Sequence, residues 1–296
     1  MSSSPCCARP GAGRPAPIDY AGAGLLIVLT LLLTVLLDRR TAETLGATPK
    51  GVMTVALVAT LVGFVAHERR ALDPVVNFAL FRIRMFTFSV LSLLLIATAN
   101  SVLAFLMPFY LQEVLHVSPS FMGLIFLAAP ILTIACAAVT GPLTDWIGPR
   151  VPTSIGVVMT MGAFGMGGLL RTDSSWTLPV LMMGLAGLGT GFFNTPNQTA
   201  VIGSVPKEYR GFAAGMVQTA FGMSSLFGIS LTGVLLTFLF RFHAGRPDVQ
   251  PSAADGPAFV AAMNDIYLVC AGLMVVALAA SLMRGGARIE AASGSP

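Results

Sequence analysis

The chain has 296 residues, of which 55% are hydrophobic and only 10% are charged, and its mean hydropathy is +0.82. A soluble domain carries about 25% charged residues, so this composition argues against a soluble enzyme. The formal net charge of +4 does not indicate nucleic-acid binding, because excess Lys and Arg in a membrane protein usually lie in cytoplasmic loops.

Eight stretches of sixteen or more residues contain no Asp, Glu, Lys or Arg. They cover residues 20–37, 51–66, 85–112, 114–144, 151–170, 174–206, 212–240 and 266–283. A helix rises about 1.5 Å per residue, so about 20 apolar residues cross a hydrocarbon core of roughly 30 Å. Uninterrupted apolar runs also exclude the alternating pattern of a barrel strand. The sequence therefore predicts an all-α, polytopic membrane bundle of eight transmembrane helices.

The two ends of the chain differ from these stretches in composition. Residues 1–18 are rich in Ser, Pro, Gly and Arg and include Cys6 and Cys7. This segment has no apolar core before a cleavage site, so we expect a disordered cytoplasmic tail and not a signal peptide. We expect a second tail over residues 285–296. The other two cysteines fall inside apolar stretches, and no cysteine spacing suggests a disulfide framework or a metal site. We expect neither a metal nor a cofactor.

Between the tails the sequence divides into three parts. Residues 19–67 hold two helices joined by a short, basic loop, and residues 68–84 form a longer charged loop. Residues 85–284 hold six more helices. The connections among these six are short except over residues 241–265, where Pro, Gly and Ala are frequent and periodicity is lost, so we expect a mobile loop there.

Basic residues suggest an orientation for this bundle. If both termini are cytoplasmic, the inside segments hold 11 of the 17 Lys and Arg residues and the outside loops hold 6. Excess Lys and Arg mark cytoplasmic loops. We therefore expect a multi-pass protein of the plasma membrane with both termini in the cytoplasm.

The most specific motif lies between the fourth and fifth predicted helices, at residues 141–150. Gly141, Asp145, Gly148 and Arg150 stand in an order that resembles the Gly-x-x-x-Asp-(Arg/Lys)-x-Gly-Arg-Arg loop of the major facilitator superfamily. The Asp can cap a helix end and pair with a basic residue, and the second Gly permits a tight turn. Such a pair can act as a charge latch on the cytoplasmic side. A tryptophan and a proline replace two basic residues of the pattern, which weakens the expected latch.

Other stretches extend the resemblance to the fourteen-span drug:proton antiporters of this superfamily. They are residues 68–74 with 81–86, residues 108–119, the run Gly-Leu-Gly-Thr-Gly at 187–191 followed by Pro196, and residues 205–211. Their order and spacing carry the match, which runs from about Asp19 to Arg284.

The resemblance implies a particular organisation and function. Residues 85–284 would form a facilitator-type C-terminal half, with the family's first six helices absent, as in a truncated or split transporter. The implied function is efflux of drugs or other small molecules by alternating access. Expected partners are an amphipathic small molecule, the lipid bilayer, and a separate six-helix half or a second copy. The alternative is a non-transporting membrane scaffold or a decayed transporter fragment.

Uncharged polar residues inside the helices are the candidates for a substrate cavity. Asn194, Asn197 and Gln198 lie at i, i+3 and i+4, on one helical face, and Asn100 and Ser101 lie in the middle of the third helix. A further candidate is Gln218, in the seventh helix. Amides in lipid must find partners, so these side chains should face the bundle interior. Hydrogen bonds between helices are the alternative role for each of them.

The predicted spans contain no buried carboxylate, so this chain by itself offers no proton-coupling group. Catalysis within the membrane has little support, because His67, His116 and His243 fall at helix ends or in loops, and no Ser/His, His/Glu or Cys/His constellation lies within one span. We therefore expect a protein that is not an enzyme.

Glycine is frequent in several of the predicted helices. Gly211 and Gly215, for example, form a small-xxx-small pair of the kind that marks close helix contacts in membranes. We expect such glycines to serve tight packing, and taken together they suit helices that slide or rock.

Overall fold

The structure is a computed structural model that describes residues 20–37, 47–68, 78–246, 250–252 and 255–284. The two predicted tails, most of the loop 68–84 and part of the segment 241–265 therefore lie outside the described residues. The chain forms two compact units, Met1–Asn77 and Phe78–Pro296. The described residues form helices, turns and short connections and include no strand, so the all-α expectation is confirmed.

The first unit contains two helices. Helix α1 covers Tyr20–Leu37 and packs against α3, which covers Ala47–Glu68. Large apolar side chains such as Ile27 and Val55 are exposed on this pair. Such exposure is expected where lipid covers a helix surface.

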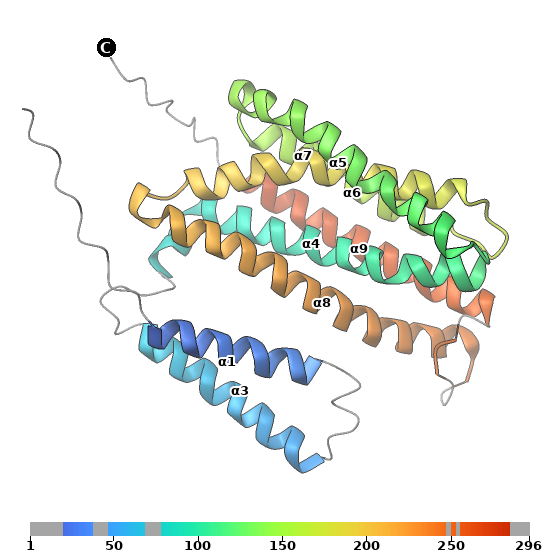
Figure 1. Ribbon diagram of the computed structural model, residues 1–296, viewed down its shortest axis with the longest axis horizontal. Coiled ribbons are helices and arrows are strands. Elements are labelled where there is room, and N and C mark those ends of the chain that lie inside the picture. The colour runs from blue at the N-terminus through green and yellow to red at the C-terminus, as the bar shows by residue number, and fades with distance from the viewer. Residues whose placement is uncertain (1–19, 38–46, 69–77, 247–249, 253–254, 285–296) are drawn as a thin grey trace, which may run out of the picture. The chain divides into compact units, whose positions relative to one another are not determined.

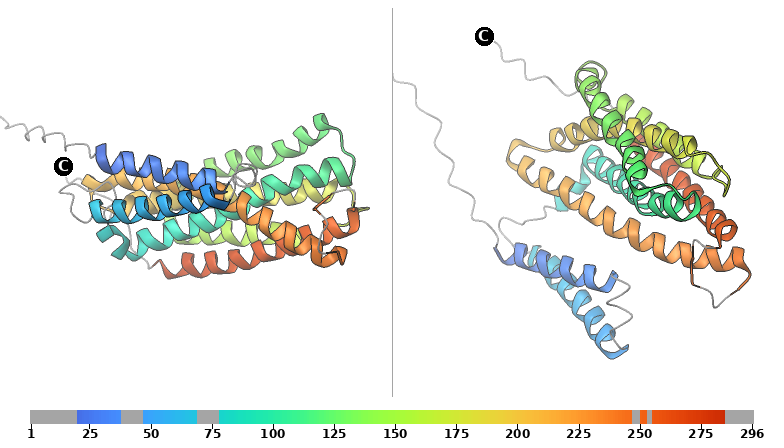
Figure 2. Two further views of the ribbon diagram at one scale, coloured as in Figure 1. Left: turned by 90° about the horizontal axis from the view of Figure 1, so that it is seen from below. Right: turned by 45° about the vertical axis from the view of Figure 1, so that its right-hand side comes forward.

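The second unit contains six long helices with short helical turns between them (Figure 1). The helices are α4 (Arg84–Phe109), α5 (Pro119–Ile147), α6 (Arg150–Gly167), α7 (Thr177–Gly203), α8 (Arg210–Ala244) and α9 (Gly256–Met283). A 3₁₀ turn precedes α4 at Phe78–Arg82, a π-helical turn follows it at Tyr110–Val114, and a 3₁₀ turn precedes α8 at Lys207–Tyr209. The helices run side by side in all views (Figure 2).

Eight α-helices are thus present in the described residues, where eight spans were predicted. Five of them, α4, α5, α7, α8 and α9, are long and apolar enough to cross a membrane by themselves. Helix α6 has only 18 residues and includes several polar ones. The second predicted stretch, Gly51–Ala66, forms a shorter apolar segment within α3. The fold is an all-α membrane helical bundle, as expected.

Local sequence explains where several helices begin and end. The Ser118 hydroxyl accepts a hydrogen bond from the Phe121 N–H at 3.4 Å, and Pro119 occupies the first turn, so this pair starts α5. Gly148 and Gly245 have positive φ angles of 78° and 64° and end α5 and α8. Glycine accepts this left-handed geometry without a steric cost.

The segment 241–265 differs from the expected mobile loop. Helix α8 continues to Ala244 and α9 already begins at Gly256, so the prediction was wrong for both ends of the segment. A proline in the first turn of a helix removes a donor that has no partner there anyway. The Pro near the start of α9 therefore marks a helix start and not a loop.

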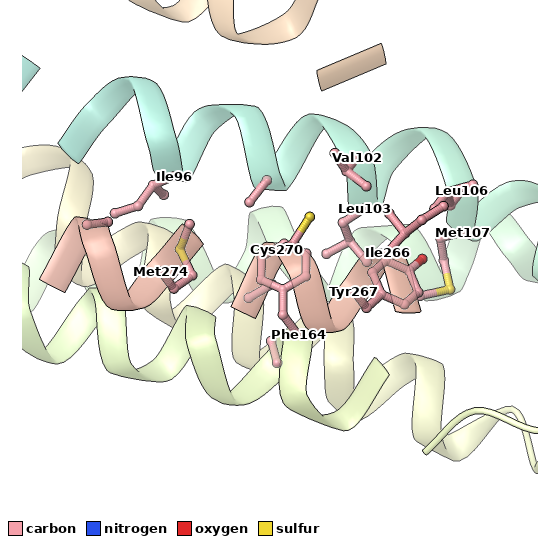
Figure 3. Packing of buried hydrophobic residues seen from close by; sticks show 14 of the residues in the cluster. Ile96, Val102, Leu103, Leu106, Met107, Phe164, Ile266, Tyr267, Cys270 and Met274 are labelled. Atoms are coloured by element: carbon pink, nitrogen blue, oxygen red, sulfur yellow. The ribbon is translucent and has the colours of Figure 1, made fainter. Parts of the chain in front are cut away.

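The buried core of the second unit joins α4, α6 and α9. Figure 3 shows Ile266, Tyr267, Cys270 and Met274 of α9 between apolar side chains of α4 and Phe164 of α6. All four α9 residues are fully buried. This packing fixes the relative position of three of the six helices.

Glycines let α7 approach its neighbours at backbone distance. A Cβ added to Gly187 would clash with the backbone of Ala129 in α5, and one added to Gly189 would meet the Gly156 carbonyl oxygen of α6 at 2.7 Å. By contrast, a Cβ at Gly211 or Gly215 would meet nothing within 4 Å. The expectation of close contact at the Gly211–Gly215 pair is therefore wrong for the described residues, while the α7 glycines do serve it.

Candidate functional site

A pocket of about 350 Å³ opens between α4, α7 and α8. Its lining is mostly apolar, with amide and hydroxyl groups among the apolar side chains. The lining residues are Leu93, Ile96, Ala97, Asn100, Ser101 and Ala104 of α4, Thr190 and Asn194 of α7, and Phe221 and Ser225 of α8. None of these side chains is ionisable, so polar contacts in the pocket come from uncharged groups.

Hydrogen bonds hold the polar lining in place. The Asn100 Nδ2 donates to Thr190 Oγ1 at 3.3 Å and so joins α4 to α7 across the pocket. Thr190 in turn donates to the carbonyl oxygen of Ala186 at 2.8 Å, and Ser101 donates to that of Ala97 at 2.9 Å. Among the described residues, Asn100 Oδ1 and the side-chain amide of Asn194 form no hydrogen bond, so both can bind a molecule in the pocket.

Helix α8, which forms the third wall of the pocket, packs closely against α4. The Ser224 hydroxyl donates to the Leu94 carbonyl oxygen at 3.0 Å. A Cβ added to Gly228 would lie 2.7 Å from the Ser101 Cβ. The two helices are therefore in contact at Ser224, which lies between Phe221 and Ser225 in the sequence, and again one turn later at Gly228, so α8 forms a firm wall of the pocket.

The predicted cavity residues lie in four different environments. Asn100, Ser101 and Asn194 come together in the pocket. Gln198 lines a second, more open pocket of about 440 Å³ on α7, with Thr195, Thr199, Ile202 and Gly203. Asn197 is fully buried, and neither amide atom has a hydrogen-bond partner among the described residues. Gln218 is exposed and lines neither pocket.

The spacing argument therefore grouped residues that the bundle separates. Positions i, i+3 and i+4 are neighbours on a helix, but α7 is packed on several sides, and a shift of one position changes which neighbour a side chain meets. Thr190 and Ser225 were missed. Thr190 precedes Asn194 by four residues, so the same helical spacing would have found it.

The 141–150 loop has part of the expected geometry. Gly148 turns the chain with φ 78°, and its N–H donates to the Thr144 carbonyl oxygen at 2.9 Å. Asp145 lies in the last turn of α5, is exposed, and pairs with no basic side chain among the described residues. The N-cap of α6 is Pro149, without a side-chain capping bond. Among the described residues, Asp145 thus makes neither a capping bond at the start of α6 nor an ion pair with Arg150.

The described residues contain no group of three or more His, Cys, Asp or Glu side chains that could hold a metal ion. His243 Nε2 and Asp265 Oδ2 lie 2.7 Å apart, within hydrogen-bond distance, and this contact joins the end of α8 to the third turn of α9. This pair lies in the segment that was expected to be irregular, away from the pocket residues along both helices.

Comparisons with known proteins agree with this architecture. The sequence model of the Major Facilitator Superfamily matches residues 89–285. The riboflavin transporter RibZ of Clostridioides difficile is 27% identical over 180 residues, which are 59% of this chain and 37% of that protein. The tetracenomycin C resistance and export protein of Streptomyces glaucescens is 28% identical over 213 residues, 71% of this chain and 39% of that protein.

The multidrug efflux pump LfrA of Mycolicibacterium smegmatis is 25% identical over 262 residues, 86% of this chain and 51% of that protein. The chain thus spans between about a third and a half of the length of these relatives. The match over most of the second unit, together with a helical membrane bundle, shows that the chain belongs to the major facilitator superfamily, a family of membrane transporters and not of enzymes, and resembles its drug-efflux members.

Proposed function

We propose that the second unit forms one wall of the substrate path of a transporter that exports an amphipathic small molecule by alternating access. The observation that carries this proposal is the pocket between α4, α7 and α8. Asn100 lies near the middle of α4 and Thr190 near the middle of α7, so the pocket lies at mid-depth of the bundle. Transporter sites typically lie near the bilayer midplane.

The lining suggests the chemistry of the substrate. Phe221, Leu93 and Ile96 offer an apolar surface, while Asn100 and Asn194 offer amide donors and acceptors. Ligand pockets usually combine a mainly apolar wall with a few polar groups that fix orientation. A molecule with an apolar ring system and neutral hydrogen-bonding groups fits this lining better than a highly charged one. The names of the multidrug and tetracenomycin exporters support this substrate class.

Rocking of the bundle about this pocket would provide alternating access. In such carriers one bundle moves against another around a fixed site, so a second bundle has to complete the path. We propose a separate six-helix half or a second copy of this chain for that role. Because no carboxylate lines the pocket, we expect no proton-driven export from this chain by itself.

We also propose that the helix ends near Arg84, Arg150 and Lys207 face the cytoplasm, following the excess of basic residues there. Single cysteines at positions 148 and 246 test this orientation with a membrane-impermeant thiol reagent. Position 246 should react from outside and position 148 only after the membrane is opened. The reverse labelling pattern would overturn the orientation.

Ligand binding by the purified chain tests the pocket. Riboflavin, which is fluorescent, and tetracenomycin C are suitable probes because relatives are named for them. Asn194→Leu should weaken binding of an accepted probe about 10-fold or more, since one or two hydrogen bonds are lost from an apolar site. Gln218→Leu is the matched control, because Gln218 is exposed and outside both pockets. Equal losses in the two variants, or no binding of any amphipathic probe by the wild-type chain, would favour the scaffold alternative.

A further inference from the structure

One arginine of this chain is buried without a partner. Arg284, directly after α9, has only 3% of its surface exposed, and its Nε, Nη1 and Nη2 atoms have no hydrogen-bond partner among the described residues. A buried, uncompensated charge is strongly unfavourable. This arginine therefore requires an explanation that packing alone does not give.

On α7, Arg284 faces an aromatic ring, and a buried amide follows one turn later. Its Cζ atom lies 5.8 Å from the centre of the Phe193 ring, within range of a cation–π interaction. Asn197 follows Phe193 by one turn on the same face of α7, and it is the fully buried amide whose oxygen and nitrogen both lack partners. Two buried polar groups without partners among the described residues are thus both close to Phe193, one cationic and one able to donate and accept.

Helix α6 packs against both Phe193 of α7 and the end of α9, where Arg284 lies. A Cβ added to Gly156 would lie 3.0 Å from the Phe193 Cβ. Ser281, one turn before Arg284, has its hydroxyl 3.3 Å from that of Thr153 and 3.1 Å from that of Ser154. These contacts place Arg284 beside the first turns of α6. Since α6 begins without a side-chain cap, its N-terminal amides and dipole add positive potential there.

Charge at this end of the bundle is also unbalanced. The described residues near the starts of α4, α6 and α8 and the ends of α5 and α9 include six basic side chains and two acidic ones, which are Arg82, Arg84, Arg150, Lys207, Arg210 and Arg284, with Asp145 and Glu208. Burial lowers the pKa of Arg284 to about 10, so the guanidinium remains charged at neutral pH. An anion is the group that would compensate it.

We propose that Arg284 and Asn197 bind one phosphate group, either from the headgroup of an anionic lipid or from free phosphate. A guanidinium binds phosphate oxygens with two parallel hydrogen bonds, and an amide nitrogen can donate a third. The neighbouring Leu282 and Met283 are 47% and 60% exposed, so the end of α9 offers an apolar surface beside Arg284 that acyl chains can contact. Basic side chains between membrane helices on the cytoplasmic side are known to bind phosphate headgroups. This inference does not depend on the transport proposal.

Thermal unfolding of the purified chain in a neutral detergent tests the site. Inorganic phosphate is added in one arm, with chloride at the same ionic strength as reference. Phosphatidylglycerol is added in the other, with phosphatidylcholine as reference. A ligand that binds only the folded state raises Tm, by about 5 °C near saturation for a chain of this size. A response to phosphatidylglycerol alone assigns the lipid as the source, and a response to both probes assigns the phosphate group itself. No response in either arm overturns the proposal.

Substitutions then show which residues the ligand-induced rise in Tm depends on. Arg284→Met should abolish it and should have a Tm without ligand equal to or above that of the wild type, because an apolar side chain replaces an uncompensated buried charge. Arg284→Lys, which keeps the charge but loses the planar fork, and Asn197→Leu should each reduce the response. Arg150→Met is the matched control, since Arg150 is an exposed arginine at the same end, and it should respond as the wild type does. A full response in Arg284→Met would assign the anion to another site and overturn the proposal; if that variant does not fold, the Arg284→Lys response decides.

Discussion

Helix α7 presents two sides that differ in how they meet their neighbours. Towards α5 and α6, glycines bring backbones together, as at Gly187 against Ala129 and at Gly189 against Gly156. Towards α4 and α8, Thr190 and Asn194 leave room for a pocket. The difference shows how a single helix can be held rigidly on one side and still line a cavity on the other. Small residues favour the first arrangement, and amides and hydroxyls favour the second.

The largest effect should come from closing the glycine contact. Gly187→Ala places a methyl group against the backbone of Ala129, and backbone cannot rotate away as a side chain can. We expect a loss of about 2–4 kcal/mol of stability, or failure to fold. Thermal unfolding in detergent and the yield of monodisperse protein measure the loss.

Gly215→Ala is the control for that variant. A Cβ there meets nothing within 4 Å, so the change should not destabilise the bundle and can stabilise it by up to about 1 kcal/mol, because alanine has the higher helix propensity. Equal destabilisation of both glycine variants would show that contact with the Ala129 backbone is not the cause, because alanine has the higher helix propensity, and the distinction between the two sides of α7 would fail.

A smaller effect should follow when one hydrogen bond on the packed side is removed. The Thr133 hydroxyl of α5 donates towards the Gly187 and Ala129 carbonyl oxygens, both at 2.9 Å. Thr133→Val keeps the shape and removes the donor, so we expect a loss of about 0.6–1.7 kcal/mol. Ligand affinity should stay unchanged, because Thr133 is not among the pocket residues. Weaker probe binding at unchanged stability would show that the two sides are not independent.

The smallest effect should come from the His243–Asp265 pair, which belongs to neither side of α7. Its side chains are 28% and 41% exposed, so solvent screens the pair. Asp265→Asn should cost about 0.2–1 kcal/mol at low salt, and the difference should shrink as salt is added. Unfolding of both proteins at two salt concentrations measures it. A cost that high salt leaves unchanged would point to a hydrogen bond and not a charge interaction.

Most of the helices could be predicted from the lengths of the apolar stretches alone, because a backbone in lipid has few alternatives to the helix. Boundaries were harder to predict. Residues 241–265 appeared irregular because Pro and Gly are frequent, yet Gly245 serves as the end of α8 and a first-turn proline fits the start of α9. Composition alone does not distinguish a helix terminus from a loop.

Part of the pocket lining could also be predicted from the sequence. Buried amides are rare enough to attract attention, so Asn100, Ser101 and Asn194 were identified from their place in apolar stretches. Which neighbouring helix each amide meets depends on helix rotation and packing, which one sequence does not encode in an obvious pattern. Asn197 was therefore grouped with Asn194 although it lies against a different part of the bundle. Arg284 was missed because its burial depends on three helices that are far apart in the sequence.

Helix α8 is longer than the membrane is thick. Its 35 residues correspond to about 52 Å, against a hydrocarbon core of roughly 30 Å. Hydrophobic mismatch of this kind is relieved by tilting the helix or by extending it into water. Phe221 and Ser225 of α8 line the pocket, so the tilt of this helix sets their distance from α4 and α7. The thickness of the surrounding bilayer should therefore tune pocket width, so that the same chain binds a given probe with different affinity in short-chain and long-chain lipids.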